Sequence, residues 1–298
     1  MNPLRALIMA ASRNETVRHL VANAPISRDV VKRFVAGETT RHAVEVVRGL
    51  GLPVTLDYLG EDTTDKAQAE KIVQAYLELL DALHAAGLAE DAEVSVKLSA
   101  VGQNLDESLA LTNASRICAA AEQCGTTVTL DMEDHTTTDS TLRILLELRR
   151  SWPWVGAVLQ TYLYRTLDDC KQLAGPGSRV RLVKGAYAEP PEVAIQDPHE
   201  VDLNYVRCLN VLLAGEGYPM FATHDPRLIE IIGERARWYD KTDFEYQMLY
   251  GIRPDEQKRL GARVYVPYGE QWYGYLMRRL AERPANVTFF LRSLASRS

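Results

Sequence analysis

The chain has 298 residues, of which 46% are hydrophobic and 25% charged, and this composition excludes disordered, collagen-like and coiled-coil proteins. Its 34 Lys and Arg residues against 40 Asp and Glu residues give a formal net charge of −6, which disfavours nucleic-acid binding because phosphate contacts need a basic surface. No apolar run approaches the roughly 18 residues of a membrane span, and the apolar start of the chain is too short for a secretory signal.

Residues 1–52 contain no strand-like run and are predicted to form a helical segment that precedes a single larger domain. Apolar residues recur at three- and four-residue spacing in Glu15–Ala22, Ser27–Val35 and Thr40–Leu50, which is the spacing of an amphipathic helix. We therefore expect three short helices that end before Pro53.

From residue 53 onward, short runs typical of β-strands alternate with longer helical stretches. The candidate strands are Val54–Leu59, Glu93–Leu98, Thr127–Asp131, Val155–Gln160, Val180–Lys184, Pro219–His224, Phe244–Leu249 and Arg263–Pro267. The helical stretches include Lys66–Ala86, Asp106–Gln123, Thr138–Arg150, Val201–Gly215 and Pro226–Trp238. Such alternation predicts a parallel sheet, and eight repeats within ~250 residues match a (β/α)8 TIM-type barrel over residues 53–298.

A doubly wound sheet is the structural alternative. Such a sheet usually has a Gly-rich turn after its first strand. The segment from Leu59 to Thr64 is not such a turn, and neither G-x-G-x-x-G nor the P-loop motif occurs in the sequence. The barrel is therefore the favoured fold.

Alternation along the strands predicts which side chains face the barrel axis, because the apolar set must face the helices. In the second strand Val94, Val96 and Leu98 form the apolar set, which turns Ser95, Lys97 and Ser99 inward. The same rule turns inward Asp57, Glu61, Thr129, Asp131, Glu133, Glu245, Gln247, Leu249 and Tyr265. A single such residue is more often part of a structural ion pair, but the whole set favours a polar ligand site at the carboxyl ends of the strands.

The last predicted helix, Trp272–Glu282, contains two adjacent arginines. Arg278 and Arg279 diverge by about 100° around the helix axis, and Glu282 lies on the same face as Arg279. One arginine can therefore bind a ligand while a carboxylate such as Glu61 or Glu282 holds the other. A solvated arginine pair is the alternative.

The cysteines indicate a reducing compartment. Cys118, Cys124, Cys170 and Cys208 are scattered without C-x-x-C spacing, so neither a zinc site nor a disulfide framework is expected. We expect reduced thiols in a cytoplasmic protein.

Seven motifs then occur in an order that resembles a known family. They are Val94–Ser99, Leu130–Asp134, Arg181–Tyr187, Ala222–His224, Glu245–Gly251, Val264–Gly269 and Tyr275–Leu280. Together they are similar to the single-function bacterial proline dehydrogenases, which are FAD-dependent (β/α)8 barrels. The resemblance covers residues 54–290.

This resemblance implies roles for individual residues. On the substrate side it implies that Arg278 and Arg279 bind the proline carboxylate, with Lys97, Asp131, Tyr265, Leu249, Tyr275 and Glu282 around the substrate and Glu61 paired with an arginine. For the cofactor it implies Gln160, Arg181, Lys184, Gly185, Ala186, Tyr187, Thr223 and His224. No metal is implied. The chain departs from the family pattern at Ala188, Asp225 and Arg283, none of which removes a group that the chemistry needs.

The implied reaction is the oxidation of L-proline to 1-pyrroline-5-carboxylate, with a hydride passing from the ring carbon next to nitrogen to FAD N5. The family passes the electrons to a quinone, which implies transient contact with the inner face of the membrane. Three alternatives stay open: a Schiff-base aldolase that uses Lys97 or Lys184, a non-catalytic flavin or amino-acid binding protein, and a preference for hydroxyproline. Tyr265 would crowd a 4-hydroxyl group, which favours proline. A metal-dependent hydrolase is disfavoured because the sequence has no H-x-H.

Overall fold

The computed structural model describes the backbone of residues 33–60 and 62–282, and the side chains of these residues up to 277. Eight parallel strands form one sheet in the order β3-β2-β1-β8-β7-β6-β5-β4. The strands are β1 (Val54–Tyr58), β2 (Ala92–Val96), β3 (Val128–Leu130), β4 (Ala157–Gln160), β5 (Arg179–Val183), β6 (Tyr218–Ala222), β7 (Glu245–Leu249) and β8 (Arg263–Tyr268). A parallel bridge between Thr129 and Gly156 joins the two sheet edges and closes the barrel.

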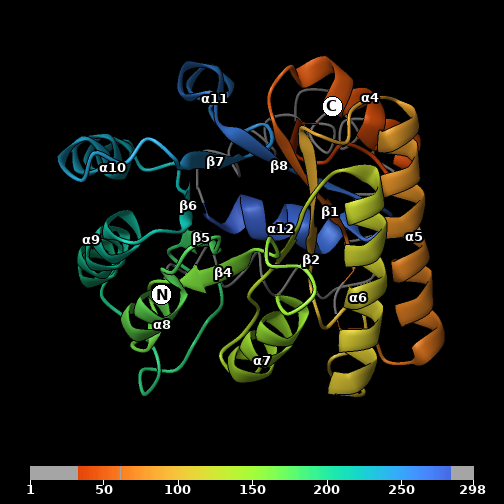
Figure 1. Ribbon diagram of the computed structural model, residues 1–298, viewed down its shortest axis with the longest axis horizontal. Coiled ribbons are helices and arrows are strands. Elements are labelled where there is room, and N and C mark those ends of the chain that lie inside the picture. The colour runs from red at the N-terminus through yellow and green to blue at the C-terminus, as the bar shows by residue number, and fades with distance from the viewer. Residues whose placement is uncertain (1–32, 61, 283–298) are drawn as a thin grey trace, which may run out of the picture.

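Helices surround the strands in Figure 1, as expected for a barrel whose crossovers are helical. They are α4 (Thr40–Leu50), α5 (Lys66–Ala85), α6 (Glu107–Cys124), α7 (Thr138–Leu148), α8 (Thr166–Leu173), α9 (Pro198–Ala214), α10 (Pro226–Trp238), α11 (Pro254–Leu260) and α12 (Trp272–Glu282). None of the helices in the described part is long and apolar enough to cross a membrane.

The sequence prediction of a (β/α)8 barrel is confirmed, and each predicted strand lies within two residues of an observed one. Helix α9 begins three residues before its predicted start, because Asp197 caps its first turn and Pro198 occupies the first helical position. Helices α8 and α11 have only 8 and 7 residues, too few for a clear helical period.

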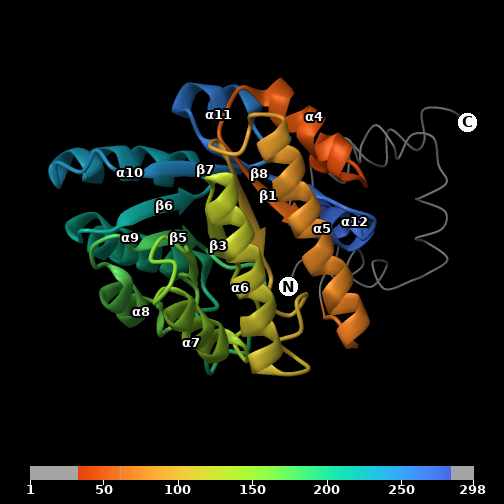
Figure 2. The same ribbon diagram turned by 45° about the vertical axis from the view of Figure 1, so that its right-hand side comes forward.

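The third predicted N-terminal helix, Thr40–Leu50, is confirmed as α4, which packs against α5 and β8. The first, Glu15–Ala22, lies outside the described residues, and so does most of the second. In Figures 1 and 2, α12 lies beside β1 instead of within the outer ring. The division of the chain between residues 52 and 53 stays a prediction.

The core lies between the strands and the surrounding helices. Val94, Val96 and Leu130 are fully buried in this layer, as alternation predicted. Of the four cysteines, three are buried and Cys124 is partly buried, and all four are free thiols within helices. Because the apolar core lies outside the strands, the side chains that point into the barrel can be polar, and these side chains form the site.

Candidate active site

A cavity of about 680 Å³ opens at the carboxyl ends of strands β3 to β7, with one wall from β8. Its lining combines the last residues of these strands with the segments that directly follow β3, β5 and β6. Parallel barrel strands all end at one face, so these residues meet although they are far apart in the sequence. The volume suits a small molecule or an organic cofactor.

The cavity brings together most of the residues that the sequence singled out. All eight residues expected at the cofactor line it: Gln160, Arg181, Lys184, Gly185, Ala186, Tyr187, Thr223 and His224. The expected substrate-side residues Asp131, Leu249 and Tyr265 line it as well. Lys97 and Tyr275 are not among the described lining residues. Lys97 directly follows β2 and its Nζ lies 3.5 Å from Asp131, and Tyr275 is buried on α12.

The side chains of four predicted site residues lie outside the described part of the structure. Arg278, Arg279 and Glu282 lie on α12, but their side chains are outside the described part of the structure, as is the whole of Glu61. Only three residues separate the end of β8 from the start of α12. Its backbone therefore starts at the carboxyl face of the barrel, and the roles of its arginines stay predictions.

Asp131 is a carboxylate on the cavity wall with contacts to both of its oxygens. Its Oδ1 accepts hydrogen bonds from Ser95 Oγ at 2.7 Å and Arg181 Nη1 at 2.8 Å. Its Oδ2 accepts from the Tyr265 hydroxyl at 2.7 Å, and Lys97 Nζ lies 3.5 Å away. Burial alone would raise the pKa of Asp131, but the charges of Lys97 and Arg181 outweigh it and lower the pKa. Asp131 is therefore an ionised acceptor at neutral pH.

Lys97 makes its closest ion pair with Asp57, not with Asp131. Its Nζ donates to both carboxylate oxygens of Asp57 at 2.7 Å. Asp57 is completely buried on β1, and this burial raises its pKa despite the ammonium beside it. The alternation rule predicted that both side chains face the axis, and this is confirmed. It could not predict which acid Lys97 prefers, because it assigns faces and not partners.

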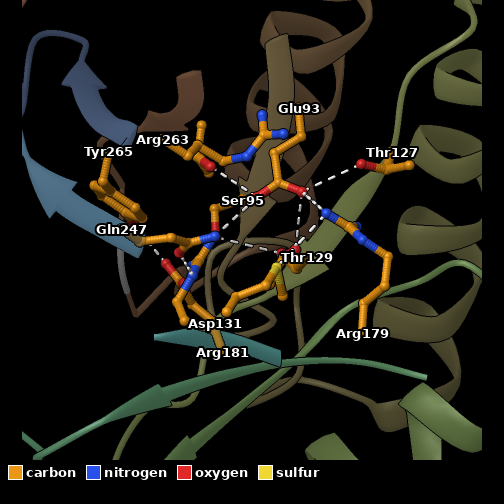
Figure 3. Close-up of polar contacts among 12 residues, drawn as sticks. Glu93, Ser95, Thr127, Thr129, Asp131, Arg179, Arg181, Gln247, Arg263 and Tyr265 are labelled. Atoms are coloured by element: carbon orange, nitrogen blue, oxygen red, sulfur yellow. Dashed lines mark hydrogen bonds and ion pairs between the residues drawn. The ribbon is translucent and has the colours of Figure 1, made fainter. Parts of the chain in front are cut away.

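Arg181 is fixed at the base of the cavity by residues from three other strands and the segment after β3 (Figure 3). Its acceptors are Gln247 Oε1 at 2.5 Å, Ser95 Oγ at 3.0 Å, Asp131 Oδ1 at 2.8 Å and Glu93 Oε1 at 3.1 Å. The Tyr265 ring lies 5.4 Å from the guanidinium carbon, within cation–π range. Its guanidinium is therefore held rigidly and contributes a fixed positive charge to the wall.

The other positive group of the cavity lies near the start of α10. Lys184 Nζ pairs with Asp202 at 2.6 Å and with Asp225 at 3.1 Å. Asp225 is also the N-cap of α10 and accepts from the backbone N–H of Arg227. Partial burial would raise the pKa of Asp225, but the hydrogen bonds that Arg227 and Lys184 donate to it lower the pKa to about 2. These contacts hold Lys184 at the rim by charge-assisted bonds.

The segment after β5 approaches the cavity through a glycine that no other residue can replace without strain. Gly185 has φ of +112°, and a Cβ added to it would lie 2.4 Å from the Tyr162 ring. Opposite this segment, His224 Nε2 accepts the backbone N–H of Leu249 at 2.9 Å. His224 is thereby oriented by β7, and its ring belongs to the wall.

Sequence reasoning missed several charged residues below the cavity. Glu93, Arg179 and Arg263 lie inside the barrel with most of their side-chain surface buried. Each precedes an inward-facing residue by two positions, so the alternation rule already implied their direction. The predicted site lay at the carboxyl ends of the strands, whereas these three residues lie toward the amino ends of β2, β5 and β8.

Comparison with known proteins agrees with this geometry. A family model described as proline dehydrogenase matches residues 40–292. A proline dehydrogenase of Deinococcus radiodurans is 43% identical over 281 residues, which cover 89% of this chain and 90% of that protein. Proline dehydrogenase 1 of Bacillus subtilis subsp. natto is 38% identical over 301 residues, with 98% and 99% coverage.

A solved structure gives the same fold. The crystal structure of proline utilization A (PutA) from Bdellovibrio bacteriovorus, inactivated by N-propargylglycine, matches with a TM-score of 0.78 and 26% identity. The match covers 94% of this chain but only 36% of that one, so this chain spans little more than a third of the larger protein. The family model and the full-length relatives together decide the assignment. The chain belongs to the proline dehydrogenase family.

Proposed function

We propose that this chain oxidises L-proline to 1-pyrroline-5-carboxylate. The observation that carries the proposal is the charged wall of the cavity, where Asp131 joins Arg181 and Tyr265 at the carboxyl face of a barrel of this family. Such a wall presents a fixed cation, an ionised acid and an aromatic ring to one small ligand. That combination suits a cyclic amino acid, which has a carboxylate, an amine and an apolar ring.

The residues of the cavity fit a flavin, and we propose FAD. The volume of about 680 Å³ accommodates a three-ring system, and Val158, Val183 and Ala186 offer apolar contact. Lys184 supplies a cation for an anionic group, and the missing side chain at Gly185 keeps the backbone close to the cavity. When bound, a flavin supplies the hydride acceptor that no amino-acid side chain provides.

The chain's own residues would hold the substrate in place. We propose that Arg278 and Arg279 on α12 bind the proline carboxylate, because paired guanidiniums grip a carboxylate by charge-assisted bonds worth roughly 1.5–3 kcal/mol each. Tyr265 and Leu249 would pack against the ring. The oxidation requires the neutral form of the amine, and the positive charges of Arg278 and Arg279 at the substrate carboxylate would favour that form.

The proposal extends to the fate of the electrons and to where the protein works. We propose a quinone as electron acceptor and a cytoplasmic protein that contacts the membrane surface transiently. The support for this part is the family alone. We expect the protein to reduce a water-soluble quinone analogue only when L-proline is added. A protein that L-proline reduces but that does not pass its electrons to the quinone analogue would contradict this part of the proposal.

The Schiff-base alternative is disfavoured by the ion pairs of its two candidate lysines. Lys97 lies between two oxygens of Asp57, and Lys184 lies between two aspartates. Ion pairing favours the ammonium form, whereas Schiff-base formation needs a neutral amine. These ion pairs therefore disfavour aldol chemistry at either lysine.

The test is the visible absorption spectrum of the purified protein under anaerobic conditions, before and after addition of L-proline. We expect a flavin spectrum that L-proline bleaches and D-proline leaves unchanged. A protein that neither carries nor takes up FAD would contradict the cofactor. A flavin that L-proline does not bleach would contradict the reaction, and a borohydride-trapped adduct on Lys97 or Lys184 would support the aldolase.

A further inference from the structure

Glu93 is a buried carboxylate at the centre of the barrel, with only 1% of its side chain exposed. Five donors from three other strands and their flanks converge on its two oxygens (Figure 3). They are Thr55 Oγ1 at 2.7 Å, Arg181 Nη2 at 3.1 Å, Arg179 Nη2 at 2.6 Å, and Thr127 Oγ1 and Thr129 Oγ1 each at 3.2 Å. Every lone-pair direction of the carboxylate is therefore in use.

The surroundings of Glu93 carry an excess of positive charge. Burial alone would raise the pKa of this carboxyl. The guanidiniums of Arg179, Arg263 and Arg181 outweigh burial and hold the pKa well below its usual range. Arg263 has its own acid in Glu245 at 3.0 Å, so Glu93 is the acid that balances Arg179 and shares Arg181 with Asp131.

Arg181 connects this charge cluster to the cavity. One terminal nitrogen of its guanidinium donates to Glu93, and the other donates to Asp131 on the cavity wall. The third nitrogen donates to Gln247, which also lines the cavity. A planar guanidinium cannot rotate toward one of these acceptors without leaving the others. The carboxylate of Glu93 therefore determines where Arg181 meets Asp131.

We propose that Glu93 is a positioning residue for the reaction in the cavity: from inside the barrel it holds the Arg181 guanidinium against Asp131 and Gln247. This inference rests on the proposed function. Glu93 does not line the cavity, so it acts only through Arg181. The competing explanation is that Glu93 stabilises the barrel by ion pairing and has no effect on the site.

Arg179 separates these explanations, because it binds the same carboxylate but does not line the cavity. In Arg179→Met, Glu93 loses one ion pair yet still holds Arg181. In Glu93→Gln, the side chain keeps its shape but Arg181 loses one of its two charged partners and keeps Asp131. Both variants disturb the same buried cluster and are expected to lower the thermal unfolding temperature. Only Glu93→Gln should disturb the cavity.

The experiment compares the wild type and both variants as flavin-loaded proteins. For Glu93→Gln we expect kcat with L-proline to fall by about tenfold or more and KM to stay within about threefold, because the proposed carboxylate-binding arginines are untouched. We also expect a shifted visible spectrum of the bound flavin. For Arg179→Met we expect kcat within about threefold of the wild type and an unshifted spectrum.

Two results would overturn the inference: a Glu93→Gln protein with near-normal kcat and spectrum, or an Arg179→Met protein that loses as much kcat as Glu93→Gln. If Glu93→Gln does not fold, Glu93→Asp takes its place with the same expected results. It keeps the charge but draws the carboxylate back from Arg181. A wild-type protein that L-proline does not reduce would contradict the proposed function, and this outcome is distinct from both.

Discussion

Asp131 illustrates how single contacts prepare the site. Three donors and a nearby ammonium surround its carboxylate, so it is kept ionised although most of its side chain is buried. The hydroxyl of Tyr265 is the donor that comes from β8, and the same ring forms part of the cavity wall. Tyr265 therefore has two separable contributions, the hydroxyl to Asp131 and the ring to the ligand.

Tyr265→Phe removes the first contribution and keeps the second. A buried hydrogen bond to a charged group contributes about 1.5–3 kcal/mol, so we expect the free energy of unfolding to fall by about that amount in chemical denaturation. Tyr58→Phe is the matched control, because the Tyr58 hydroxyl has no hydrogen bond within the described part of the structure. Equal stability losses in the two variants would contradict the role of the Tyr265–Asp131 bond.

Arg278→Lys tests the proposed binding of the substrate carboxylate. A guanidinium can make two parallel hydrogen bonds to a carboxylate, whereas an ammonium acts as a point charge. We expect the KM for L-proline to rise by about tenfold or more, with the amount of bound flavin unchanged. Arg259→Lys, an exposed position on α11, is the control for a general effect of the substitution. Near-normal KM in Arg278→Lys would remove this arginine from the site.

At the level of elements, the segment after β5 depends on the absence of a side chain at Gly185. A methyl group there would meet the Tyr162 ring at 2.4 Å, and φ of +112° disfavours any L-residue. Gly177 has φ of +72°, but a Cβ there would meet nothing within 4 Å. The two glycines therefore separate backbone strain from steric contact.

Gly185→Ala should destabilise the protein more than Gly177→Ala does. We expect the additional loss in the free energy of unfolding to be about 1–3 kcal/mol, the usual cost of overpacking. We also expect less bound flavin per mole of purified Gly185→Ala protein, because the segment that follows β5 lines the cavity. Denaturant titration and the flavin-to-protein absorbance ratio measure the two effects. Equal losses of unfolding free energy in both variants would show that the Tyr162 ring moves to accommodate the methyl group.

The same scale shows what the sequence could predict. All eight strands were predictable because alternation and turn residues mark them locally, and the inward side chains of Asp131, Gln247 and Tyr265 followed from the same alternation. The partners of those side chains were not predictable, since contacts such as Arg181 with Glu93 join strands from opposite sides of the barrel. Spacing along one strand carries no information about the strand across the axis.

On the scale of the whole molecule, polar contacts tie opposite sides of the barrel together. Glu93 on β2 bonds Arg179 and Arg181 on β5, and Arg181 continues to Gln247 on β7. Burying these charges carries a desolvation cost that only mutual pairing offsets. The stability of the barrel should therefore depend on the ionisation of its central acid.

The pH dependence of this stability has a defined sign for each acid. The pKa of Glu93 is lower in the folded protein than its ordinary value of 4.5, so its stabilising contribution is complete above that value and is lost as the pH falls. Asp57 acts in the opposite direction, because its pKa is raised by burial and its contribution is lost as the pH rises. The unfolding free energy of the wild type as a function of pH contains both contributions. The contribution of Glu93 alone therefore has to be obtained by comparing the wild type with a variant.

The difference in unfolding free energy between the wild type and Glu93→Gln isolates the first acid. We expect it to be constant from neutral pH down to the ordinary pKa of glutamate and then to shrink by about 1.4 kcal/mol per pH unit. Urea titrations at several pH values measure it, with the exposed Glu90→Gln as a control whose difference from the wild type should be small at each pH. A Glu93→Gln difference that stays constant in acid would mean that the three guanidiniums do not hold Glu93 ionised in the folded barrel. The cluster would then contribute nothing to the loss of stability in acid.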